Sequence, residues 1–175
     1  MGTKPRRALI VVWALVGGML SFGTSAAQAA GTLTNVSWTV TNNQVSATSV
    51  TYSYSFKTAT AGTIKTITFA VSGSGLAGTP AIAKNYGIGA GTVSRSGQTI
   101  TYTVTSAVSV SAGIPIYVEF SGLTNSSSAG SYTTSITTQT AAPATIDGPT
   151  ASNTVTLAAN NTAVTVTVAK SLTFT

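Results

Sequence analysis

The sequence predicts an all-β fold, an antiparallel β-sandwich of about eight or nine short strands. Beyond the first thirty residues, apolar and polar residues alternate with a period of two, and no segment has the 3.6-residue period of a helix. The alternating segments are rich in Thr, Val, Ile, Tyr and Phe, which favour strands. Clusters of Gly, Asn, Ser and Pro separate them, as turns do. A small barrel would give the same alternation, and the sandwich is the favoured alternative.

The first segment has the pattern of a secretory signal peptide. The basic residues Lys4, Arg6 and Arg7 precede an apolar run, Ala8–Leu20, which is shorter than the roughly 20 residues of a membrane span. An Ala-x-Ala motif at 27–29 matches the cleavage rule. The sequence therefore predicts a signal peptide at 1–29 and a single sandwich domain at 30–175. An uncleaved anchor helix and a twin-arginine address are the alternatives.

The predicted strands of the first half follow one another closely. Apolar alternation marks residues 36–40, 50–56 and 67–71, and turn residues occupy 41–43, 61–62 and 72–75. Lys57 has the opposite parity from the apolar residues of its strand, as an outward charge should. The stretch Gly75–Gly91 is less regular, and we interpret it as a long connection with a short strand around Ile82.

The second half continues the pattern at residues 100–104, 114–120, 132–136, 155–157 and 164–168. Turn signals lie at 96–97, 111–113, 125–130 and 160–161, and Asp147-Gly148-Pro149 is interpreted as a further turn. Glu119 has the polar parity of its strand, so we expect it at the surface. Parity also predicts that six aromatic side chains are largely buried: Trp38, Tyr54, Phe69, Tyr102, Phe120 and Tyr132.

The last segment, Thr162–Thr175, stays apolar and β-branched to its end. An edge strand this apolar is normally protected from pairing with another chain by charged residues, Pro or a covering loop. In this segment only Lys170 interrupts the apolar run. The favoured interpretation is that it closes the domain's own sheet. The alternative is that it adds to the sheet of a neighbouring molecule and builds a filament. The candidate assembly strand consists of Val164, Val166, Val168, Leu172 and Phe174.

The composition excludes many kinds of chemistry. The chain contains no His and no Cys, and only 6% of its residues are charged. Disulfides, zinc or haem sites built on His and Cys, and Ser-His-Asp or Cys-His catalysis are therefore excluded. Glu119 and Asp147 are the only carboxylates that could form an acid–base pair, and their surroundings favour plain surface and turn roles. We expect no enzyme, no catalytic residue, no cofactor and no metal.

The charges of the mature chain are few and scattered. Without the signal peptide, the net charge is about +3, from Lys57, Lys65, Lys84, Arg95 and Lys170 against Glu119 and Asp147. Nucleic-acid binding requires clustered basic residues with stacking aromatics. We therefore expect no nucleic-acid partner, and no stable membrane span after cleavage.

The second half also resembles a known kind of module. The run 111–133, SAGIPIYVEFSGLTNSSSAGSYT, is similar to a strand-and-turn pattern of modules in bacterial and archaeal cell-surface and extracellular structural proteins. Residues 94–104 resemble the hairpin that precedes this pattern in such modules. Residues 164–174 resemble the strand that often leads from one such module to the next. The resemblance covers roughly residues 48–175. It implies an immunoglobulin-like sandwich, mostly without catalysis.

These observations predict a secreted, extracellular or cell-surface protein that acts structurally or by interaction. Its partners would be itself or other cell-surface proteins, with assembly by strand addition as one route. The alternative is a carbohydrate-binding module. Tyr117 has polar parity and Tyr86 lies in the irregular connection, so both are candidate glycan contacts.

Overall fold

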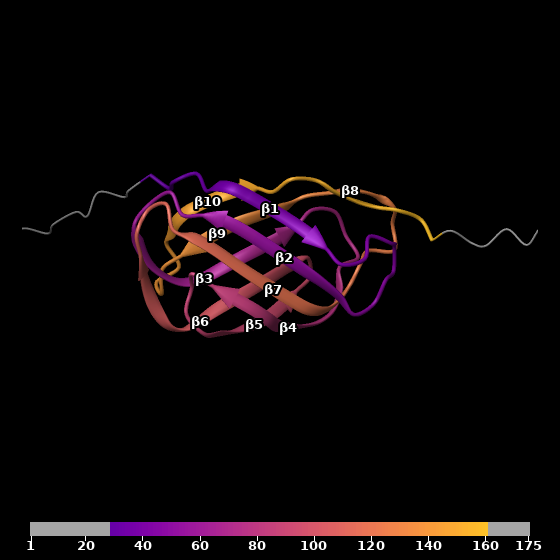
Figure 1. Ribbon diagram of the computed structural model, residues 1–175, viewed down its shortest axis with the longest axis horizontal. Helices are drawn as coiled ribbons and strands as arrows, with labels where there is room; N and C mark the ends of the chain where they lie inside the picture. The colour runs from indigo at the N-terminus through magenta and orange to yellow at the C-terminus, as the bar shows by residue number, and fades with distance from the viewer. Residues whose placement is uncertain (1–28, 161–175) are drawn as a thin grey trace, which may run out of the picture.

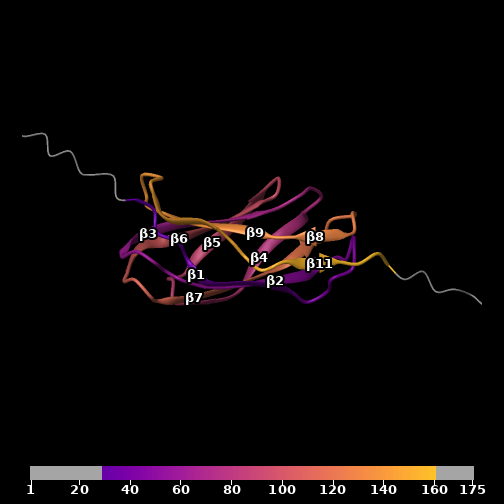
Figure 2. The same ribbon diagram turned by 90° about the horizontal axis from the view of Figure 1, so that it is seen from above.

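The computed structural model describes residues 29–160, which form strands and connecting loops. Two antiparallel sheets contain most of the strands, and Figure 2 shows them as two layers. The first sheet has the order β1-β2-β7-β4, with β1 (Thr34–Val40), β2 (Val50–Lys57), β7 (Pro115–Thr124) and β4 (Ala77–Tyr86). The second has the order β10-β9-β3-β6-β5, with β10 (Thr145–Ala151), β9 (Thr134–Gln139), β3 (Gly62–Val71), β6 (Thr99–Val110) and β5 (Gly91–Ser96). A small sheet pairs β11 (Val155–Leu157) with β8 (Gly130–Tyr132).

The prediction of an all-β, antiparallel, sandwich-like fold is confirmed. The part of the chain that the structure describes contains no helix that could cross a membrane. Two predicted features lie outside the described residues. These are the signal peptide, apart from its last residue, and the candidate assembly strand Val164, Val166, Val168, Leu172 and Phe174.

The core lies between the two main sheets and is dominated by aromatic rings. Phe120 of β7 packs edge-on against Phe69 of β3, with the ring centroids 5.3 Å apart. Tyr54 of β2 contacts both Phe69, at 4.5 Å, and Phe120, at 6.1 Å. Such aromatic pairs stabilise a core beyond the area that they bury. The predicted core is confirmed, because every one of its six aromatic side chains is at most 8% exposed: Trp38, Tyr54, Phe69, Tyr102, Phe120 and Tyr132.

The strand expected around Ile82 is present, but it is longer than predicted and takes up most of the stretch Gly75–Gly91 that was interpreted as a connection. Residues 77–86 form β4, the edge strand that pairs with β7, and β5 begins at Gly91. The pairing of β4 with β7 shifts register twice, between Gly78 and Ala81 and between Ile82 and Lys84. Each bulge places an extra residue on one strand and reverses the parity that follows it. The alternation that reveals a strand in sequence is therefore broken, although the strand is present.

The described chain enters and leaves at opposite ends of the long axis (Figure 1). At the entry, Gly31 forms a parallel bridge with Asp147 of β10. At the exit, Ala158 forms a parallel bridge with Gln44, in the loop after β1. Both ends of the described chain are therefore fixed to the sandwich by backbone pairing.

Candidate functional site

The outer face of the first sheet brings together the two tyrosines that were expected at the surface. The pairing of β4 with β7 places Tyr86 directly opposite Tyr117. Tyr86 is 68% exposed, and Tyr117 is half-buried beside it. Residues that face each other across antiparallel strands have Cα atoms about 4.5–5.5 Å apart. The two candidate glycan contacts therefore share one surface, which neither sequence position indicated alone.

An ion pair lies two residues along the same strands. Lys84 faces Glu119, with 3.3 Å between Nζ and Oε2. The Tyr117 hydroxyl donates a hydrogen bond to the Glu119 carboxylate, and Ser53 Oγ donates another at 3.4 Å. The Tyr117 hydrogen bond, assisted by Lys84 and opposed by partial burial, lowers the pKa of Glu119 below its ordinary value. Glu119 is therefore ionised at neutral pH and neutralises Lys84.

A shallow hollow of about 220 Å³ adjoins Tyr117 on the same face. Its lining includes Tyr117 and Pro115 of β7, Ser55 and Lys57 of β2, and Asn35 of β1. The β2–β7 register sets Ser55 opposite Tyr117 and Lys57 opposite Pro115. The hollow therefore continues the surface of Tyr86 and Tyr117 onto β2. We call this surface the tyrosine face, defined by Tyr86, Tyr117, Lys84, Glu119 and Lys57.

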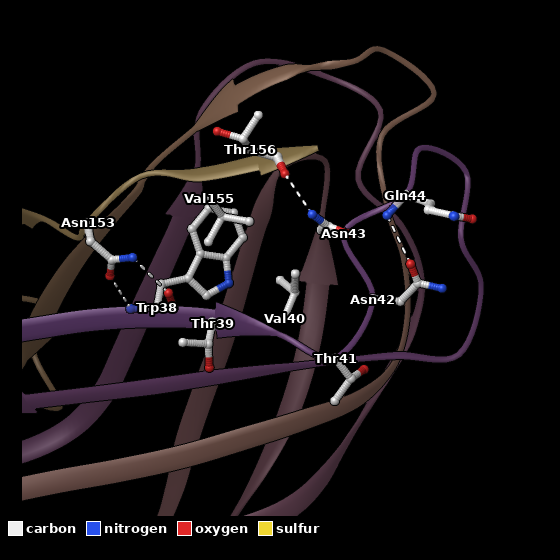
Figure 3. A pocket seen from close by; sticks show the side chains of 10 residues that line it. All are labelled: Trp38, Thr39, Val40, Thr41, Asn42, Asn43, Gln44, Asn153, Val155 and Thr156. Atoms are coloured by element: carbon white, nitrogen blue, oxygen red, sulfur yellow. Dashed lines mark hydrogen bonds between the residues drawn. The ribbon is translucent and has the colours of Figure 1, made fainter. Parts of the chain in front are cut away.

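A larger hollow, the Trp38 cleft, lies between β1 and β11 (Figure 3). It measures about 590 Å³ and is lined by neutral side chains from residues 38–44, 153, 155 and 156. The Asn153 amide closes one end, because it accepts a hydrogen bond from Trp38 N at 2.7 Å and donates one to Trp38 O at 3.0 Å. Among the described residues, Trp38 Nε1 is the one buried side-chain polar atom without a partner.

The Trp38 cleft differs from the tyrosine face in its aromatic surface. The Trp38 ring is 1% exposed and packs against Tyr52 and Tyr54. It therefore offers no open ring for a ligand to stack on, whereas Tyr86 does. The cleft also lacks a charged side chain in its lining. The tyrosine face is for these reasons the better candidate binding site.

The two acidic side chains of the sequence, Glu119 and Asp147, lie in different sheets. Glu119 is on the outer face of the first sheet, whereas Asp147 is completely buried in β10 of the second. The interpretation of Asp147-Gly148-Pro149 as a turn is wrong, because the segment lies inside β10. Asp147 accepts hydrogen bonds from the backbone N–H groups of Ala59, at 3.1 Å, and Thr60, at 2.9 Å. The carboxylates are thus not placed to act together on one substrate.

Asn125 is a structural residue that the sequence did not reveal. The sequence predicts that it begins a turn, and in the structure it follows β7 directly and is 1% exposed. Its Oδ1 accepts a hydrogen bond from the Tyr52 hydroxyl at 2.8 Å, and its Nδ2 donates to the carbonyls of Asn42 and Gln44, both at 2.8 Å. Asn125 thereby positions residues 42–44, which form one wall of the Trp38 cleft. An Asn before small polar residues carries no local signal of this role.

Within residues 29–160, no group of three or more His, Cys, Asp or Glu side chains is placed to hold a metal ion. Comparison of the chain with protein families, with curated proteins and with solved structures finds no match. The resemblance to a cell-surface module therefore stays a prediction.

Proposed function

We propose that this chain is a secreted, non-catalytic structural and interaction protein of the cell surface or extracellular matrix. The leader pattern at residues 1–29 supports export. The observation that carries the proposal is the tyrosine face, where Tyr86 and Tyr117 are paired on a sheet surface outside the core. Aromatic residues are enriched at binding interfaces because one side chain supplies a large, rigid contact.

The strand order supports an immunoglobulin-like arrangement of this module. Such sandwiches have strands A, B, E and D in one sheet and C, F and G in the other. When β1, β2, β3, β4, β7, β9 and β10 are taken as A to G, the sheets become A-B-E-D and G-F-C. The β5–β6 hairpin then extends the second sheet beyond β3. Modules of this architecture suit a structural role, because the sheets hold their faces rigid.

The carboxylates support a non-catalytic role. Glycoside hydrolysis requires two carboxyl groups that flank one bond, about 5–9.5 Å apart. Here Asp147 is buried against backbone amides, and Glu119 lies on the outside of the opposite sheet.

A binding assay with intact cells tests the proposed role. The labelled mature chain is expected to bind the surface of cells of its source, and Tyr86→Ser with Tyr117→Ser is expected to reduce that binding at least fivefold. Ile114→Ser is a matched control, because Ile114 is the other exposed large apolar side chain among those described. Equal binding by the double variant and the wild type would remove the tyrosine face from the proposal.

Carbohydrate binding is the second candidate function. It is favoured by the pairing of Tyr86 with Tyr117, because sugar rings pack against exposed aromatic rings. A glycan array and a polysaccharide pull-down on the mature chain separate the candidates. Retention on polysaccharide that needs both tyrosines supports a carbohydrate-binding module. Retention on surface protein alone supports an interaction protein.

Self-assembly by strand addition remains a proposal for residues 162–175. If this segment closes its own sheet, deletion of Ala163–Thr175 should unfold the monomer. If it donates a strand to a neighbour, the deletion should leave a soluble subunit that no longer polymerises. Analytical ultracentrifugation of both chains at high concentration distinguishes these results. A full-length chain that stays monomeric, with a truncated chain that simply melts, would exclude assembly through this segment.

A further inference from the structure

We propose that the tyrosine face binds an acidic polysaccharide, with sugar rings against Tyr86 and Tyr117 and a sugar carboxylate at Lys57. This inference rests on the second candidate function, carbohydrate binding, and names its ligand class. Among the basic residues that the structure covers, Lys57 is the cation that is free to bind a ligand, and the side chains of three neighbouring strands bring it close to both tyrosines.

Lys57 differs from the other cations that the structure describes. Lys84 is paired with Glu119. Lys65 Nζ donates to the carbonyls of Val104, at 2.6 Å, and Thr105, at 3.0 Å. Arg95 likewise donates to backbone carbonyls, those of Leu76, Gly78 and Gly97. Lys57 alone has no hydrogen-bond or ion-pair partner within residues 29–160, and it is exposed.

The position of Lys57 links its charge to the tyrosines. Lys57 and Tyr117 both line the 220 Å³ hollow. Tyr86, Tyr117 and Ser55 follow one another on β4, β7 and β2, and adjacent strands lie about 4.7–4.9 Å apart. Lys57 is two residues beyond Ser55 on the same face. A chain of sugar rings that crosses the strands over both tyrosines therefore reaches the ammonium group of Lys57.

The net charge of the tyrosine face determines which charge a ligand should carry. Lys84 and Glu119 neutralise each other at 3.3 Å, so Lys57 leaves an excess of one positive charge. A neutral glycan can offer Lys57 only hydroxyl oxygens as hydrogen-bond acceptors, whereas a carboxylate in the hollow accepts a stronger hydrogen bond between opposite charges. In the same arrangement, Glu119 weakens the binding of an acidic ligand because it occupies the ammonium group of Lys84. Replacing Glu119 with a neutral amide would free Lys84 and leave two available cations.

The test compares two polymers that differ only in charge. Polygalacturonate and the same polymer after reduction of its carboxyl groups are titrated against the full mature chain. The wild type should bind polygalacturonate at least fivefold more tightly, and salt should weaken this preference. Lys57→Gln should remove it, and Glu119→Gln should increase it about two- to fivefold.

Thr63→Glu provides the matched control. Thr63 is an exposed position in β3 of the second sheet, and this substitution changes the net charge by the same amount as Lys57→Gln. Thr63→Glu should leave the preference for the acidic polymer within twofold of the wild type. Equal losses in Thr63→Glu and Lys57→Gln would indicate diffuse attraction and overturn the assignment to Lys57.

The outcomes separate this inference from the function on which it rests. Equal, tyrosine-dependent binding of both polymers would overturn the acidic class and retain the carbohydrate-binding function. No binding of either polymer, together with no hit on the glycan array, would overturn both. Circular dichroism and thermal unfolding of each variant establish that a loss of binding does not come from unfolding.

Discussion

The substitution Asp147→Asn tests the most unexpected contact of the fold. Asp147 is completely buried, and its two carboxylate oxygens accept hydrogen bonds from the N–H groups of Ala59 and Thr60. Asparagine has almost the same shape but only one oxygen. Its NH₂ group would therefore face one of the two backbone donors, and no cavity is created that would complicate the comparison.

The magnitude follows from the hydrogen bonds that change. A hydrogen bond to a charged group contributes about 1.5–3 kcal/mol, and an unsatisfied buried donor costs about 1–3 kcal/mol. Removal of a buried charge returns part of its desolvation penalty and offsets some of this loss. We expect Asp147→Asn to lower the free energy of unfolding by about 2–4 kcal/mol. For a domain of this size, Tm should fall by about 6–12 °C.

Urea unfolding at pH 7 measures this loss directly. The chain contains two tryptophans, and one of them, Trp13, lies in the predicted signal peptide. Fluorescence of the mature chain therefore reports on Trp38 in the core. Lys84→Gln is the control, since this exposed lysine forms a surface ion pair and should contribute less than about 1 kcal/mol. A loss below about 1 kcal/mol in Asp147→Asn, or one equal to the control, would refute the assigned role of Asp147.

Three further predictions concern the core and its polar contacts. Phe120→Ala should lower the free energy of unfolding, measured in urea, by about 3–5 kcal/mol, because the ring is fully buried against Phe69 and Tyr54. A loss below about 1 kcal/mol would contradict the placement of Phe120 in the core. Asn125→Ala should lower the free energy of unfolding by about 2–4 kcal/mol, since it removes both hydrogen bonds to the carbonyls of Asn42 and Gln44. It should also shift the backbone NMR signals of residues 42–44, and unchanged signals would contradict the proposed contact. Burial, and secondarily the charge of Tyr132, raises the pKa of Tyr52 to about 12 from its ordinary value of 10.0. The neutral Tyr52 side chain therefore stabilises the fold fully below pH 10, and this stabilisation is lost as the pH rises toward 12. Unfolding free energies measured from pH 8 to 12 should therefore fall above pH 10, more steeply in the wild type than in Tyr52→Phe.

The core could be predicted from the sequence because it depends on strand parity alone. A strand with one buried face has to alternate, whatever its neighbours are. Parity alone therefore predicts Trp38, Tyr54 and Phe120 in the core, where the structure places them. The sequence predicted only a short strand around Ile82, and the full length of β4 was missed because its two bulges break the alternation.

The misassigned and missed residues depend on contacts with distant parts of the chain. Asp-Gly-Pro is a strong local turn pattern, but Asp147 instead bonds to Ala59 and Thr60, 88 and 87 residues away. The adjacency of Tyr86 and Tyr117 likewise depends on the β4–β7 register beyond two bulges. The sequence could place each tyrosine at the surface, but only the register makes them one site.

The parallel bridges at the two ends of the described chain have a mechanical consequence. Gly31 accepts a hydrogen bond from Gly148 N at 2.7 Å and donates one to Ile146 O at 3.1 Å, and Ala158 is held in the same way between Asn43 and Val45. Tension applied at residues 29 and 160 would slide each parallel pair lengthwise, so its hydrogen bonds would be sheared together. Antiparallel hairpins pulled apart from one end open one bond at a time instead. The domain is thus expected to resist stretching along its long axis more strongly than its thermal stability would suggest.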